Sequence, residues 1–268
     1  MRGLRLTPRN APGRLTIIRH MANLGQTTLA QMMLQLPGGG QRKFIFRPDS
    51  VGDVGVIDQI FRAADYQIHP DARFQTLVRY AAAQAAVGKR PLVIDAGANI
   101  GASSVYFALQ YPTGRVVAVE PEKGNADLLR LNSEGLDIVV REAALGAEPG
   151  SAFLSDPGHS DWGFRVGESG SVPVSMVSVP ELLQDADALQ LFPLICKIDI
   201  EGGEAALFAK NTAWVDQFAL IIIELHDWLL PGEGNSRNFL RTIAANDFDF
   251  MYRGENAFCF NNRLLRGI

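Results

Sequence analysis

Five apolar runs separated by helical patterns constrain the fold of this chain more than any other feature of its sequence. The runs are short: 91–97, 114–121, 136–145, 191–202 and 218–227. The strand in each ends in a polar or charged residue, namely Asp95, Glu120, Glu142, Asp199, and Glu224 with His226. Helix-like segments lie between the first three runs and after the fourth: 100–111, 125–134 and 203–211. Near-continuous apolar strands that alternate with helices are typical of a parallel sheet covered on both faces. The sequence therefore predicts an α/β fold with a doubly wound sheet.

The remaining segments are predicted to flank this sheet. After a helix at 236–247, two further strands read as an antiparallel hairpin at the sheet edge, 248–252 and 256–260. Residues 146–190 form an insertion rich in Gly, Ser and Pro, with one strand at 171–179. Before the sheet we expect irregular chain, then one strand and two helices: 1–40, 43–48, 54–66 and 71–87. We therefore divide the chain into an N-terminal arm and cap and a larger binding domain, 1–90 and 91–268.

Composition limits the class of protein. Of the 268 residues, 47% are apolar and 20% are charged, which suits one large globular domain. No apolar run approaches the ~20 residues of a membrane helix, and no secretory signal follows the basic N-terminus. Cys196 and Cys259 lie in apolar strand-like runs, as reduced core thiols do. We therefore expect a cytoplasmic protein without a membrane span.

Charge is distributed unevenly, although the net charge is only −4. Residues 1–48 carry eight Lys or Arg and no acid. A basic arm can contact nucleic acid or anionic lipid. Here the Arg residues are spaced singly and aromatic residues are scarce, so we favour a solvated leader and predict no nucleic-acid partner.

The first motif with chemical content is the stretch VIDAGANIG, residues 93–101. Asp95 closes a strand, and Gly97 and Gly101 flank the turn into a helix. Glycine lets the backbone approach a ligand, and a helix N-terminus offers N–H groups to an anion. A dinucleotide site favours a glycine where Asn99 stands, so a small anion such as an amino-acid carboxylate fits better than a pyrophosphate. The alternative is a tight strand–helix turn without a ligand.

The second motif is Glu120, which ends the second strand 25 residues after Asp95. This is the usual position of an acid that binds the two hydroxyls of a ribose. The alternative is a helix-capping acid, but Asn125 is better placed to cap the next helix. A ribose acid and a carboxylate site together describe S-adenosyl-L-methionine better than NAD.

These blocks resemble the FkbM family of S-adenosylmethionine-dependent methyltransferases. Four signature-like blocks carry the resemblance, with a fifth that looks like the family's N-terminal block: 93–108, 116–132, 196–208, 221–228 and 46–66. The resemblance covers roughly residues 44–262. It implies the class I methyltransferase fold, a Rossmann-like sheet of seven strands. It also implies methyl transfer to a hydroxyl of a sugar or polyketide-like natural product, hence a small-molecule or glycan acceptor.

The stretch CKIDIEGGE, residues 196–204, places three acids at the end of the fourth strand. In a class I methyltransferase this strand end faces the methyl group of the cofactor. Carboxylates there can stabilise the positive sulfonium and accept a substrate proton. We predict that Asp199 and Glu201 are catalytic, with Lys197 neutralising one neighbour. Glu204 falls in the first turn of the next helix, where an acid suits the helix dipole, so we interpret it as mainly structural.

The fifth strand ends with Glu224 and His226 on one face. The fourth and fifth strands are neighbours in this fold, so His226 is expected near Asp199. We predict that His226 is the general base, because its pKa lies closest to neutral. The alternative is a structural histidine. A second alternative, which we favour less, is a site for divalent Mg²⁺ or Mn²⁺ built from both strand ends: Asp199, Glu201, Glu224 and His226.

The resemblance also assigns the cofactor contacts. The methionine end falls to residues around the first turn: Asp95, Gly97, Ala98, Asn99, Gly101 and Ser104. Glu120 and Pro121 take the ribose, Glu142 and Ala143 flank the adenine, and Tyr66 contacts the cofactor from an N-terminal segment that acts as a lid.

Features outside these motifs leave three choices open. His159 and Trp162 lie in a loop of the insertion, where the Trp either stacks on a ligand or pins the loop. Two rivals to the methyltransferase are a non-catalytic nucleotide-binding module that supports a biosynthetic partner, and an NAD-dependent oxidoreductase. Asn99 and the absence of a Tyr-x-x-x-Lys pair argue against the oxidoreductase.

Overall fold

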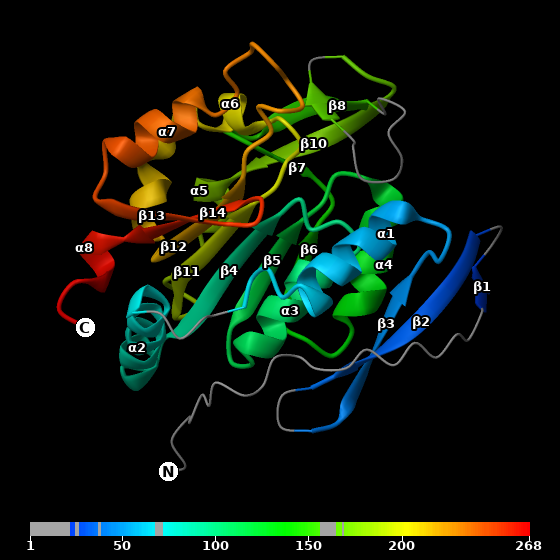
Figure 1. The fold of residues 1–268 in the computed structure, drawn as a ribbon, viewed down its shortest axis with the longest axis horizontal. Coiled ribbons are helices and arrows are strands. Elements are labelled where there is room, and N and C mark those ends of the chain that lie inside the picture. The colour runs from blue at the N-terminus through cyan, green and yellow to red at the C-terminus, as the bar shows by residue number, and fades with distance from the viewer. Residues whose placement is uncertain (1–21, 25–26, 37–38, 68–71, 156–164, 168) are drawn as a thin grey trace.

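A computed structural model of the chain describes residues 22–24, 27–36, 39–67, 72–155, 165–167 and 169–268 (Figure 1). Its centre is a seven-stranded sheet of order β13-β14-β12-β11-β4-β5-β6. Five of these strands are parallel to one another: β4 (Arg90–Ala96), β5 (Arg115–Val119), β6 (Ile138–Arg141), β11 (Leu191–Ile198) and β12 (Leu220–Glu224). An antiparallel hairpin forms one edge: β13 (Phe248–Arg253) and β14 (Asn256–Asn261).

The order of these strands confirms the predicted fold class. Numbered along the chain, the seven strands run 3-2-1-4-5-7-6 across the sheet. The first five follow the doubly wound order, and the exchange of the last two produces the predicted hairpin. The chain turns to opposite sides of the sheet after β4 and β11, which are neighbours. A ligand crevice is therefore expected outside the carboxyl ends of these two strands.

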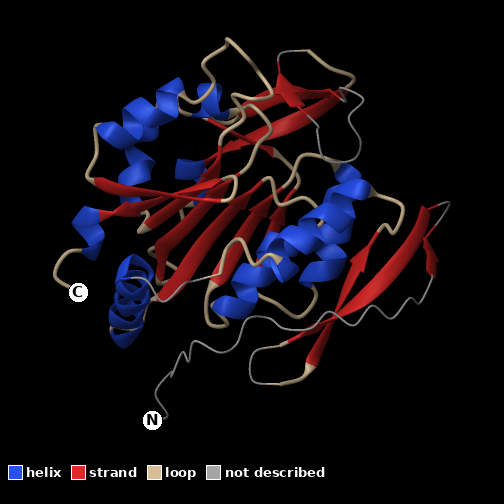
Figure 2. Cartoon of the chain, in the orientation of Figure 1, coloured by secondary structure: helices blue, strands red, loops and turns tan. Residues whose placement is uncertain are grey.

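Helices cover both faces of the sheet, as Figure 2 shows. One face carries α2 (Ala72–Ala86), α3 (Ala102–Gln110) and α4 (Lys123–Ser133). The other carries α5 (Val179–Leu182), α6 (Glu204–Leu207), the 3₁₀ segment η2 (Thr212–Gln217) and α7 (Arg237–Ala244). Neighbouring strand residues face opposite layers, with Ile195 in the first apolar cluster and Cys196 in the second. Burial on both faces explains why the strands read as continuous apolar runs. A short helix, α8 (Asn262–Leu265), ends the chain.

The N-terminal segment contains more regular structure than the sequence predicts. We expected irregular chain over residues 1–40, yet its described part holds β1 (Ala22–Leu24) and β2 (Thr27–Gln35), which pair with β3 (Gln41–Phe46) in an antiparallel sheet. The expectation was wrong. Side-chain burial along β2 alternates with the period of two that is typical of a strand, since Ala30, Met32 and Leu34 are buried between more exposed neighbours.

The predicted helix at 54–66 also differs. It begins earlier, as α1 (Val51–Ile57), because the Ser50 side chain accepts a hydrogen bond from the Asp53 N–H and caps it. It continues as a π-helix, η1 (Asp58–Arg62). The predicted helix at 203–211 is shorter than expected: α6 ends at Leu207, and η2 begins at Thr212 after a left-handed Asn211.

The insertion forms a second sheet instead of the single predicted strand. Four strands pair in the order β7-β10-β8-β9, namely β7 (Ala144–Gly146), β8 (Gly150–Ser155), β9 (Arg165–Gly167) and β10 (Val172–Ser178). The predicted strand at 171–179 corresponds to β10. Short strands rich in Gly and Ser gave too weak a pattern for the others. Within the part of the chain that the structure describes, no helix is both long and apolar enough to cross a membrane.

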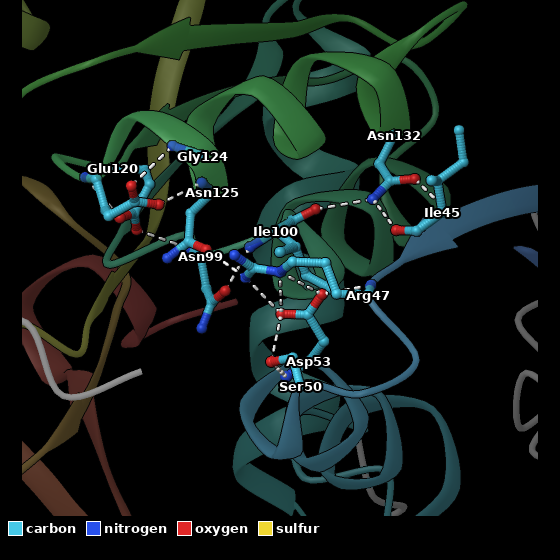
Figure 3. Close-up of polar contacts among 11 residues, drawn as sticks. Ile45, Arg47, Ser50, Asp53, Asn99, Ile100, Glu120, Gly124, Asn125 and Asn132 are labelled. Atoms are coloured by element: carbon cyan, nitrogen blue, oxygen red, sulfur yellow. Dashed lines mark hydrogen bonds and ion pairs between the residues drawn. The ribbon is translucent and has the colours of Figure 1, made fainter. Parts of the chain in front are cut away.

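A buried side chain attaches the N-terminal sheet to the domain. Asn132, at the end of α4, accepts a hydrogen bond from the Ile45 N–H (2.7 Å) and donates to the carbonyls of Ile45 and Ile100 (2.9 Å each) (Figure 3). Phe44 of β3 and Val93 of β4 belong to one apolar cluster. The N-terminal segment and the central sheet thus share a core.

Candidate active site

A cavity of about 510 Å³ opens at the carboxyl ends of β4, β5 and β11. This volume is typical of small-molecule sites (about 300–1,000 Å³). The N-terminal segment contributes part of its wall through Gln59, Ile60 and Tyr66, and the inserted sheet contributes another part through Ser151, Val166 and Met176. Several predicted site residues line it: Tyr66, Gly97, Ala98, Asn99, Glu120, Pro121, Asp199, Glu201 and Glu224.

The turn after β4 is shaped by close contact with the turn after β11. Gly97 has φ +74°, and a Cβ at this position would overlap the Asp199 carbonyl oxygen. Asn99 is also left-handed (φ +50°), and its side chain accepts a hydrogen bond from the Ile100 N–H at 2.7 Å. Backbone strain of this kind in a non-glycine residue is typical of functional turns.

The backbone N–H groups of this turn are not available to an anion, because they already donate to other groups. The N–H groups of Gly97 and Ala98 donate to the Val119 carbonyl, and that of Asn99 donates to Glu120. The first residues of α3, Ala102 and Ser103, line the cavity instead. N–H groups at a helix start have no acceptor within the helix. The N–H groups at the start of α3, the helix N-terminus named in the sequence analysis, are therefore the candidates for contact with an anion.

Asp95 is fully buried and supports the turn from behind. Its carboxylate accepts hydrogen bonds from the hydroxyls of Ser103 (2.6 Å) and Ser104 (2.5 Å). Gly101 packs against Leu129, where a Cβ would lie 2.6 Å from the Leu129 Cδ1 atom. The structure places Asp95, Ser104 and Gly101 behind the cavity wall.

Lys197 links both turns. Its Nζ donates to the Gly97 carbonyl at 2.8 Å and lies 3.3 Å from Asp95 and 3.4 Å from Asp199. Burial lowers the pKa of Lys197, but the charges of Asp199 and Asp95 outweigh it and hold the pKa above the usual value. The predicted neutralising role of Lys197 is therefore shared between two acids.

Glu120 lies at the other end of the cavity and is 6% exposed. One carboxylate oxygen accepts the Glu122 N–H at 2.9 Å and the other accepts the Asn99 N–H at 2.8 Å (Figure 3). Burial raises the pKa of Glu120 to about 7, against the hydrogen bonds that lower it. The cap of α4 is Glu122, whose side chain accepts from Gly124 and Asn125, so the expectation that Asn125 caps this helix was wrong.

The two residues predicted beside an adenine lie outside the cavity. The Glu142 side chain is 39% exposed and pairs with Arg130 at 2.6 Å. Ala143 is buried, and its N–H donates to the Glu120 carbonyl. The cavity wall here begins one residue later, with Ala144 and Leu145 of β7.

Four predicted residues meet at the ends of β11 and β12. The His226 Nε2 atom lies 3.6 Å from Asp199 Oδ1, 3.6 Å from Glu201 Oε2 and 3.5 Å from Glu224 Oε1. His226 itself is 1% exposed and lies behind the three carboxylates, which line the cavity. Glu201 has φ +51°, a further strained position at this site.

Glu204 holds His226 from the far side of the ring. It is fully buried, and its Oε1 lies 2.8 Å from His226 Nδ1. The Asn235 amide donates to its other oxygen and accepts from the Ala205 N–H at 3.1 Å. Sequence analysis missed this contact of Glu204 and the role of Asn235. The signal was present, since a charged residue directly after two glycines and inside an apolar stretch must be paired when buried.

The charges of this cluster shift each other's protonation. Burial lowers the pKa of His226, but the hydrogen bond that its Nδ1–H donates to Glu204 and the charges of Asp199, Glu204 and Glu201 raise it to about 9. Burial, together with the charge of Asp199, raises the pKa of Glu201 to about 7 and also raises that of Glu224. The cluster holds more acid than its histidine and lysine neutralise, so it favours a bound cation.

Three of these residues have the geometry of a metal site. One ligand atom each from Asp199, Glu224 and His226 lie within 4.8 Å of one another. Carboxylate oxygens with one imidazole nitrogen suit a divalent ion, and a histidine oriented by a carboxylate on its other nitrogen is common among metal ligands. Glu201 is outside this set of three.

Tyr66, predicted to contact the cofactor, lines the cavity. The side chain is 5% exposed, and its ring stacks on Phe107 with centroids 5.3 Å apart. Burial raises the pKa of Tyr66, and Lys197 and Asp199 are the strongest charges acting on it. His159 and Trp162 lie outside the described residues.

Comparison with known proteins decides the family. The methyltransferase FkbM domain matches residues 95–253, more than half of the chain. The chain belongs to this family. The resemblance inferred from the sequence blocks is thus confirmed.

A curated relative is the hexuronic acid methyltransferase AglP of Haloferax volcanii, 25% identical over 140 residues. The match covers 51% of this chain and 56% of that protein, so the FkbM chain spans little more than half the relative's length. Among solved structures, the O-methyltransferase from Bacillus cereus in complex with SAH aligns over 77% of this chain and 91% of its own, with 16% identity and a TM-score of 0.40. A methyltransferase from Geobacter sulfurreducens aligns over 79% and 90%, with 16% identity and a TM-score of 0.36. At these scores the strand order, rather than the alignments, carries the fold assignment.

Proposed function

We propose that the chain is an S-adenosyl-L-methionine-dependent O-methyltransferase that acts on a hydroxyl group of a sugar or a polyketide-like natural product. One observation carries the proposal. A single cavity has a buried acid, Glu120, at one end and an acid cluster around His226 at the other. The name of the curated relative, a hexuronic acid methyltransferase, supports a sugar acceptor.

The residues of the cavity fit this cofactor. A carboxylate has about four lone-pair sites, and two N–H groups occupy two of them on Glu120. The others remain for the two hydroxyls of a ribose. Ala102 and Ser103, at the start of α3, suit the amino-acid carboxylate. When bound, S-adenosyl-L-methionine supplies a methyl group on a positively charged sulfur. Asp199 and Glu201 neutralise that charge.

His226 is proposed to accept the proton of the attacking hydroxyl. In the empty cavity, a pKa of about 9 keeps the imidazole protonated at neutral pH. A base must be neutral to act. A second positive charge in the cavity disfavours the imidazolium and lowers the pKa of His226 toward the working range. Glu204 then stabilises the imidazolium that forms when the hydroxyl proton arrives, and fixes the ring so that Nε2 faces the three carboxylates that line the cavity.

Calorimetric titration of the purified protein with S-adenosyl-L-homocysteine, with NAD in parallel, tests the cofactor. We expect micromolar binding of the first ligand alone. Glu120→Gln should weaken it by at least tenfold, since a good hydrogen bond to a charged group contributes about 1.5–3 kcal/mol. Exposed Glu142→Gln is the matched control and should bind normally. NAD binding of similar strength, or an unchanged affinity in Glu120→Gln, would overturn the assignment.

The same protein distinguishes an enzyme from a non-catalytic nucleotide-binding module. His226→Ala should keep its affinity for S-adenosyl-L-homocysteine while losing methyl transfer from labelled S-adenosyl-L-methionine to a hydroxylated acceptor. The module is favoured if the wild-type protein binds S-adenosyl-L-homocysteine but transfers no methyl group to any of the sugar and polyketide-like acceptors tested.

A divalent ion at the acid cluster is the second candidate, and the mutual distances of Asp199, Glu224 and His226 are the observation that favours it. In that case these three residues would hold the ion, and the chemistry it would supply is polarisation of a hydroxyl oxygen in place of a base. Titration with Mn²⁺, followed by electron paramagnetic resonance, separates the two mechanisms. One bound Mn²⁺ that His226→Ala abolishes supports the ion, and binding that Glu224→Gln leaves intact argues against it.

A further inference from the structure

The N-terminal segment reaches the proposed ribose acid through two side chains, which Figure 3 shows side by side. Arg47 follows β3, and its Nη2 atom donates to the Oδ1 atom of Asn125 at 2.6 Å. Asn125 is 3% exposed and lines the cavity together with Glu120, and its side chain lowers the pKa of the Glu120 carboxyl. Arg47 lies outside the residues that the FkbM domain matches.

The chemistry of these groups fixes the direction of the hydrogen bonds. An arginine has donors only, so it must take the amide oxygen of Asn125. The amide nitrogen is then left as the group that faces Glu120, and it can only donate. Without Arg47 the amide is free to rotate and present its oxygen, which would repel a carboxylate. Arg47 therefore decides which end of Asn125 meets Glu120.

Arg47 is itself held rigidly. Its guanidinium binds Asp53 through Nε at 3.0 Å and through Nη2 at 2.6 Å, and its backbone N–H donates to the same carboxylate at 2.7 Å. Asp53 is 1% exposed, and the Ser50 hydroxyl donates to it at 3.1 Å. A planar guanidinium can bind a carboxylate and a third group at once, which an ammonium cannot do with the same geometry.

We propose that Arg47 is a positioning residue that orients the Asn125 amide toward Glu120 and thereby sets the affinity of the cavity for a ribose. The inference rests on the proposed function, in which Glu120 accepts hydrogen bonds from the ribose hydroxyls. Only an ionised carboxylate can accept from both hydroxyls. A donor held against Glu120 keeps it ionised at lower pH than burial alone would allow.

The pH dependence of cofactor affinity gives a readout that a merely structural role would not move. Burial raises the pKa of Glu120 to about 7, the N–H groups of Glu122 and Asn99 lower it, the charge of Glu122 raises it, and Asn125 lowers it. In the wild type, the dissociation constant for S-adenosyl-L-homocysteine should rise as the pH falls below about 7. The other charged groups that line the cavity, and His226 behind its wall, are unchanged in each variant. The lining groups are Glu148, Lys197, Asp199, Glu201, Lys210, Glu224 and Glu255.

The experiment measures this dissociation constant by calorimetry from pH 5.5 to 8.5. The proteins compared are the wild type, Arg47→Lys, Asn125→Ala, the double variant of these two, and a control. Arg47→Lys keeps a charge for Asp53, and Asn125→Ala removes the relay while leaving the Arg47–Asp53 pair. We expect each to move the midpoint up by about one pH unit, the size of one hydrogen bond to a charged group. The double variant should move it no further than Asn125→Ala does.

Arg42→Lys is the matched control. Arg42 also ties the N-terminal sheet to α4, through the carbonyls of Asn132 and Glu134 at 2.6 Å each, without approaching Glu120. Its midpoint should equal that of the wild type. Two results would overturn the positioning role of Arg47. One is a midpoint pH in Arg47→Lys equal to that in Arg42→Lys, and the other is a midpoint shift in the double variant equal to the sum of the two single shifts. The ribose assignment is overturned instead if the dissociation constant for S-adenosyl-L-homocysteine does not depend on pH in the wild type and does not change in Glu120→Gln.

Discussion

At the scale of single residues, His226 is the most consequential group of the protein. It is 1% exposed, and Glu204 and three cavity carboxylates surround it. The surrounding acids raise the pKa of His226 from 6.5 to about 9, although burial acts in the opposite direction. The folded protein therefore binds the histidine proton more tightly than the unfolded chain does.

This difference predicts how stability depends on pH in the cofactor-free protein. A group whose pKa is raised on folding stabilises the protein below its unfolded pKa, and that stabilisation is lost as the pH rises through the folded value. The free energy of unfolding should thus fall between pH 6.5 and pH 9, by up to about 3 kcal/mol for a shift of this size. Urea unfolding at several pH values measures it. His226→Gln should flatten the curve in this window, and an equally steep curve in that variant would contradict the prediction.

Residue identities at the strand ends were predictable, and their partners were not. Acids at the ends of apolar strands, such as Asp199 and Glu224, stand out because an unpaired buried charge is costly. The partners of Glu204 come from a different cause. His226 is 22 residues away and Asn235 is 31 residues away, so only the folding of the β12–α7 connection onto α6 brings them together.

At the scale of elements, α4 joins the two parts of the chain. Its first turn supplies Asn125 to the cavity, and its last turn supplies Asn132 to β3 and to the turn that precedes α3. A helix whose polar residues are buried at both ends is unlike a surface helix, and Asn132 satisfies three backbone groups at once.

Asn132→Ala should destabilise the protein by about 2–4 kcal/mol, because it leaves buried N–H and C=O groups of Ile45 and Ile100 without partners. Thermal or urea unfolding measures the change. Asn246→Ala is the control, since Asn246 is half-buried and its side chain makes one hydrogen bond, to the Thr242 carbonyl. Similar losses in both variants would show that Asn132 does not hold β3 in place.

Elements with long apolar runs were predicted well, and short or alternating ones were not. The parallel strands and α2 follow from periodicity alone, because burial on two faces or on one helical stripe leaves a strong pattern. In contrast, β8 and β9 consist of a few residues, many of them Gly and Ser. Their pairing depends on β10, which lies farther along the chain than either strand.

At the scale of the whole molecule, the two halves of the sheet touch at the cavity. The turn after β4 and the turn after β11 approach so closely at Gly97 that no side chain fits between them. Lys197 then joins the same two turns through Asp95 and Asp199. The shape of the cavity floor thus depends on contact between the halves.

Gly97→Ala should therefore unfold the floor of the site, with a loss of stability of at least about 3 kcal/mol and of cofactor binding. Gly88→Ala is the matched control: Gly88 has a similar backbone angle (φ +83° against +74°) but open space around it. That variant should lose only about 1 kcal/mol, the cost of the left-handed conformation. Equal losses would mean that conformation, and not contact between the turns, requires glycine.

The inserted sheet has a consequence for how proteins of this architecture diversify. It enters and leaves the domain at a single paired position, because Gly146 at the end of β7 and Ser178 at the end of β10 are register partners. A segment whose ends lie side by side can be exchanged for one of another length without moving the strands that hold Glu120 or His226. This segment also lines the cavity through Ser151, Val166 and Met176. Exchange of this segment would thus change the wall of the cavity and leave those strand ends unchanged.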